Sequence, residues 1–201
     1  MAAKSDFGLI RAYLRGSDEA FAILFDRHSR SLHAFAYHLT GNLPDAEDLS
    51  QSAWLRALRS LGSFTARGSF RAWLHEIALN LYRDERRRSR SPTVELDSQH
   101  ADEDPMADPE HVAERGDARR ELRAALAGLE PEHREVLVLH KIQGLKYREI
   151  AQTLRCPVGT VKSRLHYAMA ALRSTLGAAR APQEVYDDVH PMPDQSECSG
   201  R

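Results

Sequence analysis

Several features that would place a chain in a common structural class are missing from these 201 residues. Only two cysteines are present, Cys156 and Cys198, which excludes a disulfide-stabilised scaffold, and their spacing does not make a metal-ligand pair. No stretch approaches the roughly 18 consecutive apolar residues of a membrane-spanning helix. The N-terminal segment lacks the unbroken apolar run of a signal peptide. We therefore expect a cytoplasmic protein that does not insert into a membrane.

Signatures of catalysis and of metal binding are missing as well. The sequence has no Gly-rich phosphate loop, no nucleophile elbow and no paired catalytic carboxylates, so we predict that the protein is not an enzyme and needs no cofactor. Among the histidines, His28, His33 and His38 are spaced by five residues, which rotate a helix by about 140° and therefore do not share a face. Without an H-E-x-x-H or paired C-x-x-C motif, we predict no metal site.

The net charge of −1 conceals four blocks of alternating sign. Residues 1–88 carry 13 basic and 10 acidic residues, a net charge of +3, and residues 89–117 carry 2 and 9, a net charge of −7. Residues 118–180 carry 12 and 5, a net charge of +7, and residues 181–201 carry 1 and 5, a net charge of −4. This pattern indicates a polyanionic partner for the two basic blocks.

The two acidic blocks are rich in Asp, Glu, Ser and Pro and poor in large apolar residues. Because such segments bury too little apolar surface to offset their conformational entropy, we predict a flexible linker over residues 89–117 and a disordered tail over residues 179–201. The remaining blocks, 1–88 and 118–178, show helical periodicity and no sustained β alternation. The predicted fold class is all-α, with a helix bundle and a helix-turn-helix domain joined by the acidic linker.

The first block contains three clear helical patterns. Apolar residues recur at three- and four-residue steps from Phe21 to Leu39, and a second helix begins at Pro44 with carboxylates in its first turn. A third amphipathic helix starts at Phe70 and ends in a basic run at Arg88. We therefore expect these helices to pack together as a bundle.

The second block has the pattern of a helix-turn-helix. Short helices are expected over residues 122–129, 131–140 and 147–154, and a tight break at 155–157 precedes a longer basic helix over 158–176. The apolar side of that last helix faces the core, so its polar side can reach base edges or phosphates of duplex DNA. A merely solvated face is the less favoured alternative, because the turn and the charge of +7 accompany the helix. The candidate residues are Arg148, Thr160, Lys162, Ser163, Arg164, His166 and Tyr167.

Aromatic and basic residues alternate between Phe64 and Arg88, a composition that suits single-stranded nucleic acid, because rings stack on bases and arginines follow phosphates. Trp73 is in phase with Leu74 and is favoured as a core residue instead. The helix from Pro44 also presents an outward acidic ridge, which could meet a basic partner, although composition alone favours carboxylates that complement the helix dipole. The strand-binding candidates are Phe64, Arg67, Phe70, Arg71, Asn80 and Arg83, and the ridge consists of Asp45, Glu47, Asp48 and Gln51.

Three segments in order resemble a known family. They are DAEDLSQSAWLRALRSLGSF (45–64), FRAWLHEIALNLYRDERRR (70–88) and LEPEHREVLVLHKIQGLKYREIAQTLRCPVGTVKSRLHYAMAALR (129–173). The chain resembles a bacterial RNA polymerase sigma factor of the sigma-70 family, in the extracytoplasmic-function (ECF) group, over residues 10–88 and 118–177. The resemblance implies promoter DNA and the clamp and flap regions of core RNA polymerase as partners, with an anti-sigma factor as a regulator.

The resemblance also implies a role for each region of the chain. Polymerase would be bound through Asp45, Glu47, Asp48, Leu49 and Gln51. The −10 element would be recognised and opened around residues 63–70 and Asn80, and the −35 element would be recognised by residues 160–167. The acidic linker would follow the path of nascent RNA. Relatives often carry arginine in the middle of the recognition helix, whereas this chain has His166 and Tyr167, so its −35 sequence is not inferred.

Two other functions stay open at the level of the residues. The chain could be a stand-alone helix-turn-helix regulator, with its first block used for dimerisation or sensing. It could also be an adaptor that binds a protein partner without contacting nucleic acid. For Cys156 and Cys198 we favour inert thiols over redox-sensitive ones.

Overall fold

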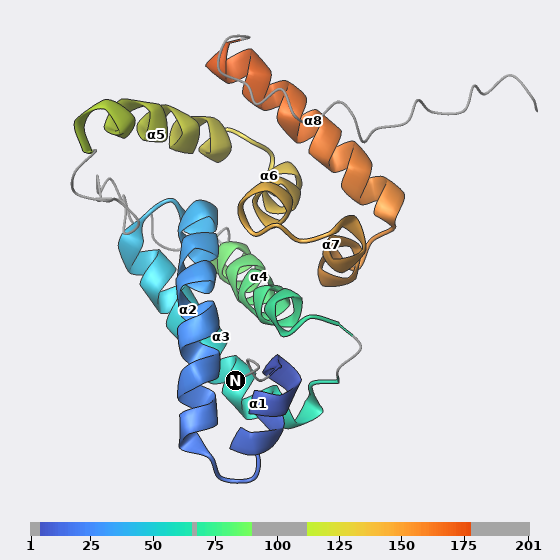
Figure 1. The fold of residues 1–201 in the computed structure, drawn as a ribbon. Helices are drawn as coiled ribbons and strands as arrows, with labels where there is room; N and C mark the ends of the chain where they lie inside the picture. The colour runs from blue at the N-terminus through green and yellow to red at the C-terminus, as the bar shows by residue number, and fades with distance from the viewer. Residues whose placement is uncertain (1–4, 66–67, 90–111, 178–201) are drawn as a thin grey trace, which may run out of the picture.

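The computed structural model describes residues 5–65, 68–89 and 112–177, and all regular structure within them is helical (Figure 1). The N-terminal half consists of α1 (Asp6–Tyr13), α2 (Asp18–Thr40), α3 (Leu43–Ser60), the 3-10 turn η1 (Leu61–Ser63) and α4 (Phe70–Ser89). The C-terminal half consists of α5 (Val112–Ala127), α6 (Pro131–Leu137), the π-helical turn η3 (Val138–Ile142), α7 (Tyr147–Leu154) and α8 (Val158–Leu176). The predicted all-α fold is confirmed.

Short polar residues and a glycine set the helix boundaries in the N-terminal half. The Ser17 hydroxyl accepts a hydrogen bond from the backbone N–H of Ala20 at the start of α2. Asn42 does the same for the N–H of Asp45 at the start of α3, at 2.9 Å. Between these two helices, Gly41 adopts a positive φ of 83°, a conformation that costs glycine little, and it thereby ends α2.

The N-terminal half is a bundle in which α2 packs against α1, α3 and α4. Its core contains Leu24, Leu32, Phe35, Leu74 and Leu79, all of them fully buried. The periodicity of the sequence therefore identified the correct faces of α2 and α4. Helix α1 was not predicted, because its eight residues are too few to establish a pattern. Its Leu9 and Ile10 are buried in the bundle.

In the C-terminal half, α8 packs on α5, α6 and α7 and lies on the side away from the N-terminal bundle (Figure 1). Val161, Leu165 and Leu172 are buried in this packing, as their spacing predicts. The break before α8 is a sharp turn in which Arg155 has a φ of 52°, the positive-φ residue other than glycine among the described residues. Cys156 follows in the same turn and is half-buried.

The two halves pack directly on each other. Helix α4 contacts α7, helix α2 contacts η3, and buried apolar residues of both halves form one continuous core. The sequence suggested two blocks held by a flexible tether and contained no signal for this contact. Helix α5 begins at Val112, so residues 112–117 of the predicted linker are helical, whereas residues 90–111 and the tail from 178 lie outside the described residues.

Phe35 provides a test of the bundle core, because it is completely buried and its ring lies 4.6 Å from that of His75. The substitution Phe35→Ala should lower the free energy of unfolding by about 3–5 kcal/mol through lost burial and a residual cavity. Urea denaturation followed by circular dichroism measures this loss. The control Phe7→Ala removes a ring that is 40 % exposed and should cost about 1 kcal/mol or less. Equal losses in the two variants would contradict the assignment of the core.

Candidate nucleic-acid interface

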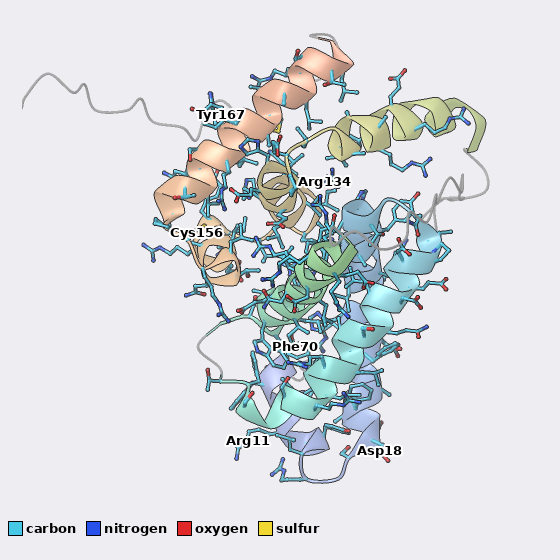
Figure 2. All side chains as sticks on the ribbon, turned by 180° about the vertical axis from the view of Figure 1, so that it is seen from behind. Arg11, Asp18, Phe70, Arg134, Cys156 and Tyr167 are labelled. Carbon is cyan, nitrogen blue, oxygen red and sulfur yellow. The ribbon has the colours of Figure 1, made fainter. Side chains whose placement is uncertain are left out.

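The polar face of α8 is the first candidate surface. Lys162, Ser163, His166 and Tyr167 are exposed on it, and Tyr167 is 60 % exposed. Figure 2 shows Tyr167 on the side of α8 that points away from the N-terminal bundle. On α7, the side chain of Arg148 is exposed too, and Thr160 lies half-buried in the first turn of α8. The structure therefore brings the predicted duplex-binding residues to one end of the C-terminal half.

Two of these side chains are positioned by neighbours in other helices. Arg164 is partly buried and forms an ion pair with Glu132 of α6, so its guanidinium is held against the protein. The ammonium group of Lys162 lies 5.9 Å above the ring of Tyr147, within the range of a cation–π contact. Lys162 is thus the more accessible of the two cations for a phosphate.

The second candidate surface surrounds three aromatic rings at the start of α4. The ring centroids of Phe64 and Trp73 are 5.3 Å apart, and each lies 5.6 Å from the centroid of Phe70. Phe70 itself is only 2 % exposed, so it supports the other two rings and has no surface to offer a base. Phe64 and Trp73 are half-buried. Trp73 packs against the hydrophobic core, as the sequence favours, and its half-buried ring also keeps some exposed surface.

Phe64 and Trp73 border a cavity of about 210 Å³ between the N-terminal and C-terminal halves. It is lined by Ser63, Phe64, Thr65, Gly68, Ser69, Ala72, Trp73, Glu76, Gln152 and Thr153. The last two belong to α7, so the C-terminal half forms one wall of this cavity. A planar group could contact the two half-buried rings only where α7 leaves room.

The polar strand-binding candidates along α4 lie in different environments. Asn80 is exposed, Arg71 is half-buried, and the guanidinium of Arg83 is held by the carboxylate of Glu135 in α6. The hydrogen bonds to Glu135 raise the pKa of Arg83 above its usual value, so the guanidinium is charged. Arg67, another predicted candidate, lies outside the described residues.

The acidic ridge on α3 is the third candidate surface. Asp45, Glu47, Asp48 and Gln51 are exposed, as predicted, whereas Leu49 is 7 % exposed and packs inward with Ala46 and Tyr37. Leu49 therefore positions the ridge from below. The sequence analysis missed Leu55, which is 55 % exposed on the same helix. Its spacing of seven residues from Asp48 was a signal that it shares the outward face.

A buried polar cluster connects α4 to the C-terminal half behind the aromatic rings. His75 is 1 % exposed, with Nδ1 placed 2.6 Å from the Arg71 carbonyl oxygen and Nε2 placed 3.2 Å from Oε1 of Gln143. The Ser31 hydroxyl donates to the same Gln143 oxygen at 2.5 Å. Burial lowers the pKa of His75 to about 4, so the ring is neutral at pH 7.

Two structural findings concern metals and membranes. In the part of the chain that the structure describes, no group of three or more His, Cys, Asp or Glu side chains is arranged to hold a metal ion. None of the helices within residues 5–65, 68–89 and 112–177 has the length and hydrophobicity that crossing a bilayer requires.

Comparison with known families identifies both halves of the chain. Residues 24–91 match the family model of sigma-70 region 2, and residues 119–172 match that of sigma-70 region 4. The ECF RNA polymerase sigma factor SigW of Bacillus subtilis is 33 % identical over 177 residues, which cover 83 % of this chain and 94 % of SigW. The ECF sigma factor SigM of Mycobacterium tuberculosis is 37 % identical over 175 residues, which cover 87 % of this chain and 86 % of SigM.

Coverage is lower for a third relative. The ECF sigma factor SigE of Mycolicibacterium smegmatis is 39 % identical over 155 residues, which cover 76 % of this chain but only 60 % of SigE.

Solved structures show the same fold. CnrH in complex with the cytosolic domain of CnrY gives a TM-score of 0.66 at 28 % identity, covering 87 % of this chain and 99 % of CnrH. The sigma factor RpoE in complex with the anti-sigma factor NepR, from Bartonella quintana, gives 0.64 at 27 % identity, covering 78 % and 96 %.

The buried ring of His75 makes stability depend on pH. The unfolded chain binds a proton at this residue from about pH 6.5 downward, whereas the folded protein binds it only near pH 4. Stability is therefore lost as the pH falls through this interval, by about 3 kcal/mol for a shift of this size. Melting temperatures measured from pH 7 to pH 4 should fall less steeply for His75→Asn than for the wild type. The control His33→Asn, at a half-buried position on α2, should keep the wild-type slope, and identical slopes in all three proteins would contradict the assignment.

Proposed function

The chain belongs to the extracytoplasmic-function group of sigma-70 factors, which direct transcription initiation, and from this premise we propose how its surfaces divide promoter recognition. One observation carries the assignment: the match to region 2 and the match to region 4 occur in order on one chain, and full-length relatives align across both. This favours a sigma factor over a stand-alone helix-turn-helix regulator, which would need only the second of these regions.

The C-terminal half is proposed to bind the −35 element as duplex DNA through α8. Lys162, His166 and Tyr167 support this role, because they are exposed together on the helix that follows the turn. Ser163, Thr160 and Arg148 would contact the adjoining phosphates, and Arg164 braces the helix through its ion pair with Glu132. The same half would bind the flap region of the polymerase.

The N-terminal half is proposed to bind and open the −10 element. The half-buried rings of Phe64 and Trp73 offer aromatic surface to an unpaired base, and Asn80 offers an amide for its hydrogen-bonding edge. Arg71 and Arg83 supply positive charge along the strand. Holding a base outside the helix would offset the unstacking cost of a few kcal/mol.

The acidic ridge of α3 is proposed to bind the clamp of core RNA polymerase. Four polar residues and Leu55 form one outward face, and the buried Leu49 fixes that face on the bundle. Leu55, which is 55 % exposed, adds apolar surface to this face that a protein partner could cover. We also propose that the protein acts in the cytoplasm, has no catalytic activity of its own and is restrained by an anti-sigma factor. The similar sigma factor RpoE of Bartonella quintana forms a complex with the anti-sigma factor NepR, which supports the last of these proposals.

In vitro transcription tests the proposed function directly. Bacterial core RNA polymerase is incubated with fragmented genomic DNA of the host, with and without this protein, and transcript 5′ ends are sequenced. Transcripts that start at discrete sites only when the protein is present are the expected result, and the shared sequences upstream define its promoter. Absence of specific starts would reject the proposal.

The ridge can be tested by reversing one charge. Asp48→Arg should reduce association with core polymerase at least tenfold, because it places a cation against a surface that accepts carboxylates. Co-elution with core polymerase on size-exclusion chromatography measures the association. The matched variant Asp26→Arg reverses an exposed carboxylate on α2, outside the ridge, and should co-elute like the wild type. Equal retention of both variants would reject the ridge as the clamp-binding surface.

The proposed −35 contact can be tested at Lys162. In the holoenzyme, Lys162→Ala should weaken binding to promoter duplex several-fold and reduce the slope of log affinity against log salt by about 1, as expected for one lost phosphate contact. Electrophoretic mobility shifts over a range of salt concentrations measure both quantities. The control Lys141→Ala removes an exposed lysine of η3 and should leave the slope unchanged. A slope equal to the wild type in Lys162→Ala would exclude this contact.

A further inference from the structure

Carboxylates of the C-terminal half contact the part of the N-terminal half assigned to −10 DNA. Glu135, which is 2 % exposed, accepts from Nε of Arg83 at 3.0 Å and forms a second contact with the same guanidinium. Glu149 of α7 accepts from the Ser69 hydroxyl at 2.8 Å, at the start of α4. Both acidic side chains therefore lie where the strand-binding surface would otherwise face solvent.

The ionisation of these groups agrees with the geometry. Burial alone would raise the pKa of Glu149, but hydrogen bonds from the Lys146 backbone N–H and from Ser69, with the positive charge of Arg71, leave it below the usual value. Glu149 is therefore an anion placed between Ser69 and Arg71. Arg71 and Arg83 were both assigned to the phosphates of the −10 strand, so each has a carboxylate of the C-terminal half as its neighbour.

The same helix lines the cavity beside the aromatic rings. Gln152 and Thr153 of α7 form its wall opposite Phe64 and Trp73. A Cβ added at Gly68 would lie 3.9 Å from Oε1 of Gln152, which is ordinary van der Waals contact. Arg155, at the end of α7, also pairs with Glu76 of α4 at 3.0 Å. A nucleotide strand could not follow α4 while α7 stays in this position.

The −35 surface is not covered in this arrangement. Helix α8 packs on α5, α6 and α7, and the exposed side chains of Lys162, His166 and Tyr167 lie on its other side. The contact between the two halves thus affects one proposed DNA surface and spares the other. A general role in stability would not require this selectivity.

We propose that the segment from α6 to α7 is an internal competitor for −10 DNA, in which Glu135 and Glu149 occupy the positions of strand phosphates until the two halves separate. This proposal rests on the proposed function of Arg71 and Arg83. Separation exposes Glu135 to water and gives Arg83 a phosphate in place of the carboxylate. The cation is therefore paired with an anion in both states, as a partly buried charge requires.

The test compares the wild type with Glu135→Gln/Glu149→Gln, which removes both negative charges with little change in side-chain shape. A fluorescent single-stranded oligonucleotide carries the −10 non-template sequence found by in vitro transcription, and its affinity for the free protein is measured by anisotropy. The variant should bind at least tenfold more tightly than the wild type, and small-angle X-ray scattering should show a larger radius of gyration. Unchanged affinity would overturn the proposal, whatever the radius.

A matched control is available on the same helix. Glu130→Gln removes an exposed carboxylate at the N-terminus of α6, which makes no side-chain capping bond, and should bind the oligonucleotide like the wild type. If the double variant fails to fold because Glu135 is buried, the single variant Glu149→Gln carries the test, since Glu149 is only half-buried. Its affinity should rise about threefold, and an affinity equal to that of Glu130→Gln would overturn the proposal.

One further variant separates this proposal from the function on which it rests. Arg83→Ala is assayed in the holoenzyme for open-complex formation at the identified promoter. If Arg83→Ala reduces open complexes but the glutamine variants bind the oligonucleotide like the wild type, only the internal competitor is rejected. If Arg83→Ala forms open complexes normally, the assignment of Arg83 to −10 DNA is rejected, and the competitor is rejected with it.

Discussion

The buried carboxylate of Glu135 constrains how the two halves of the molecule meet. Removing a carboxylate from water costs several kcal/mol unless a cation and further hydrogen bonds replace the solvent. Arg83 supplies that cation from α4, and the contact fixes α6 against the C-terminal part of that helix. The π-helical turn η3 follows α6 directly and places Gln143 beside Ser31 and His75. Helix α7 then reaches the start of α4.

Helix α4 consequently serves two partners that exclude each other. Its inner side, with Leu74 and Leu79, belongs to the bundle core in any arrangement of the halves. Its other residues face either the C-terminal half or, by our proposal, an unpaired DNA strand. When the halves separate, water or phosphate can replace the partners in ion pairs and hydrogen bonds. A wholly apolar contact would instead expose hydrophobic surface to water. The interface between the halves combines such polar contacts with the shared apolar core, so separation would replace the polar partners and would also expose apolar residues to water.

The helices and their buried faces were largely predictable from the sequence, because burial repeats with the helical period. Val161 and Leu165 on α8 are examples, as is Phe35 on α2. The aromatic and basic composition around Phe70 predicted a strand-binding surface but could not distinguish the buried ring of Phe70 from the half-buried rings of Phe64 and Trp73, since this depends on how η1 and α4 meet. The pairing of Arg83 with Glu135 joins residues 52 apart across the undescribed segment, and no local pattern encodes it.

Block charges and individual charges carry different information in this chain. The net charge of +7 over residues 118–180 indicated a nucleic-acid partner but gave no role to the five acidic residues of this block. In the structure, Glu132 braces the recognition helix through Arg164, whereas Glu135 and Glu149 contact the N-terminal half. The electrostatic attraction between a carboxylate and a cation in contact is stronger than the screened interactions among distant cations. The few anions of a basic domain can therefore determine which of its conformations is stable. The sum of the charges indicates the class of partner, and by our proposal the positions of Glu135 and Glu149 control access to it.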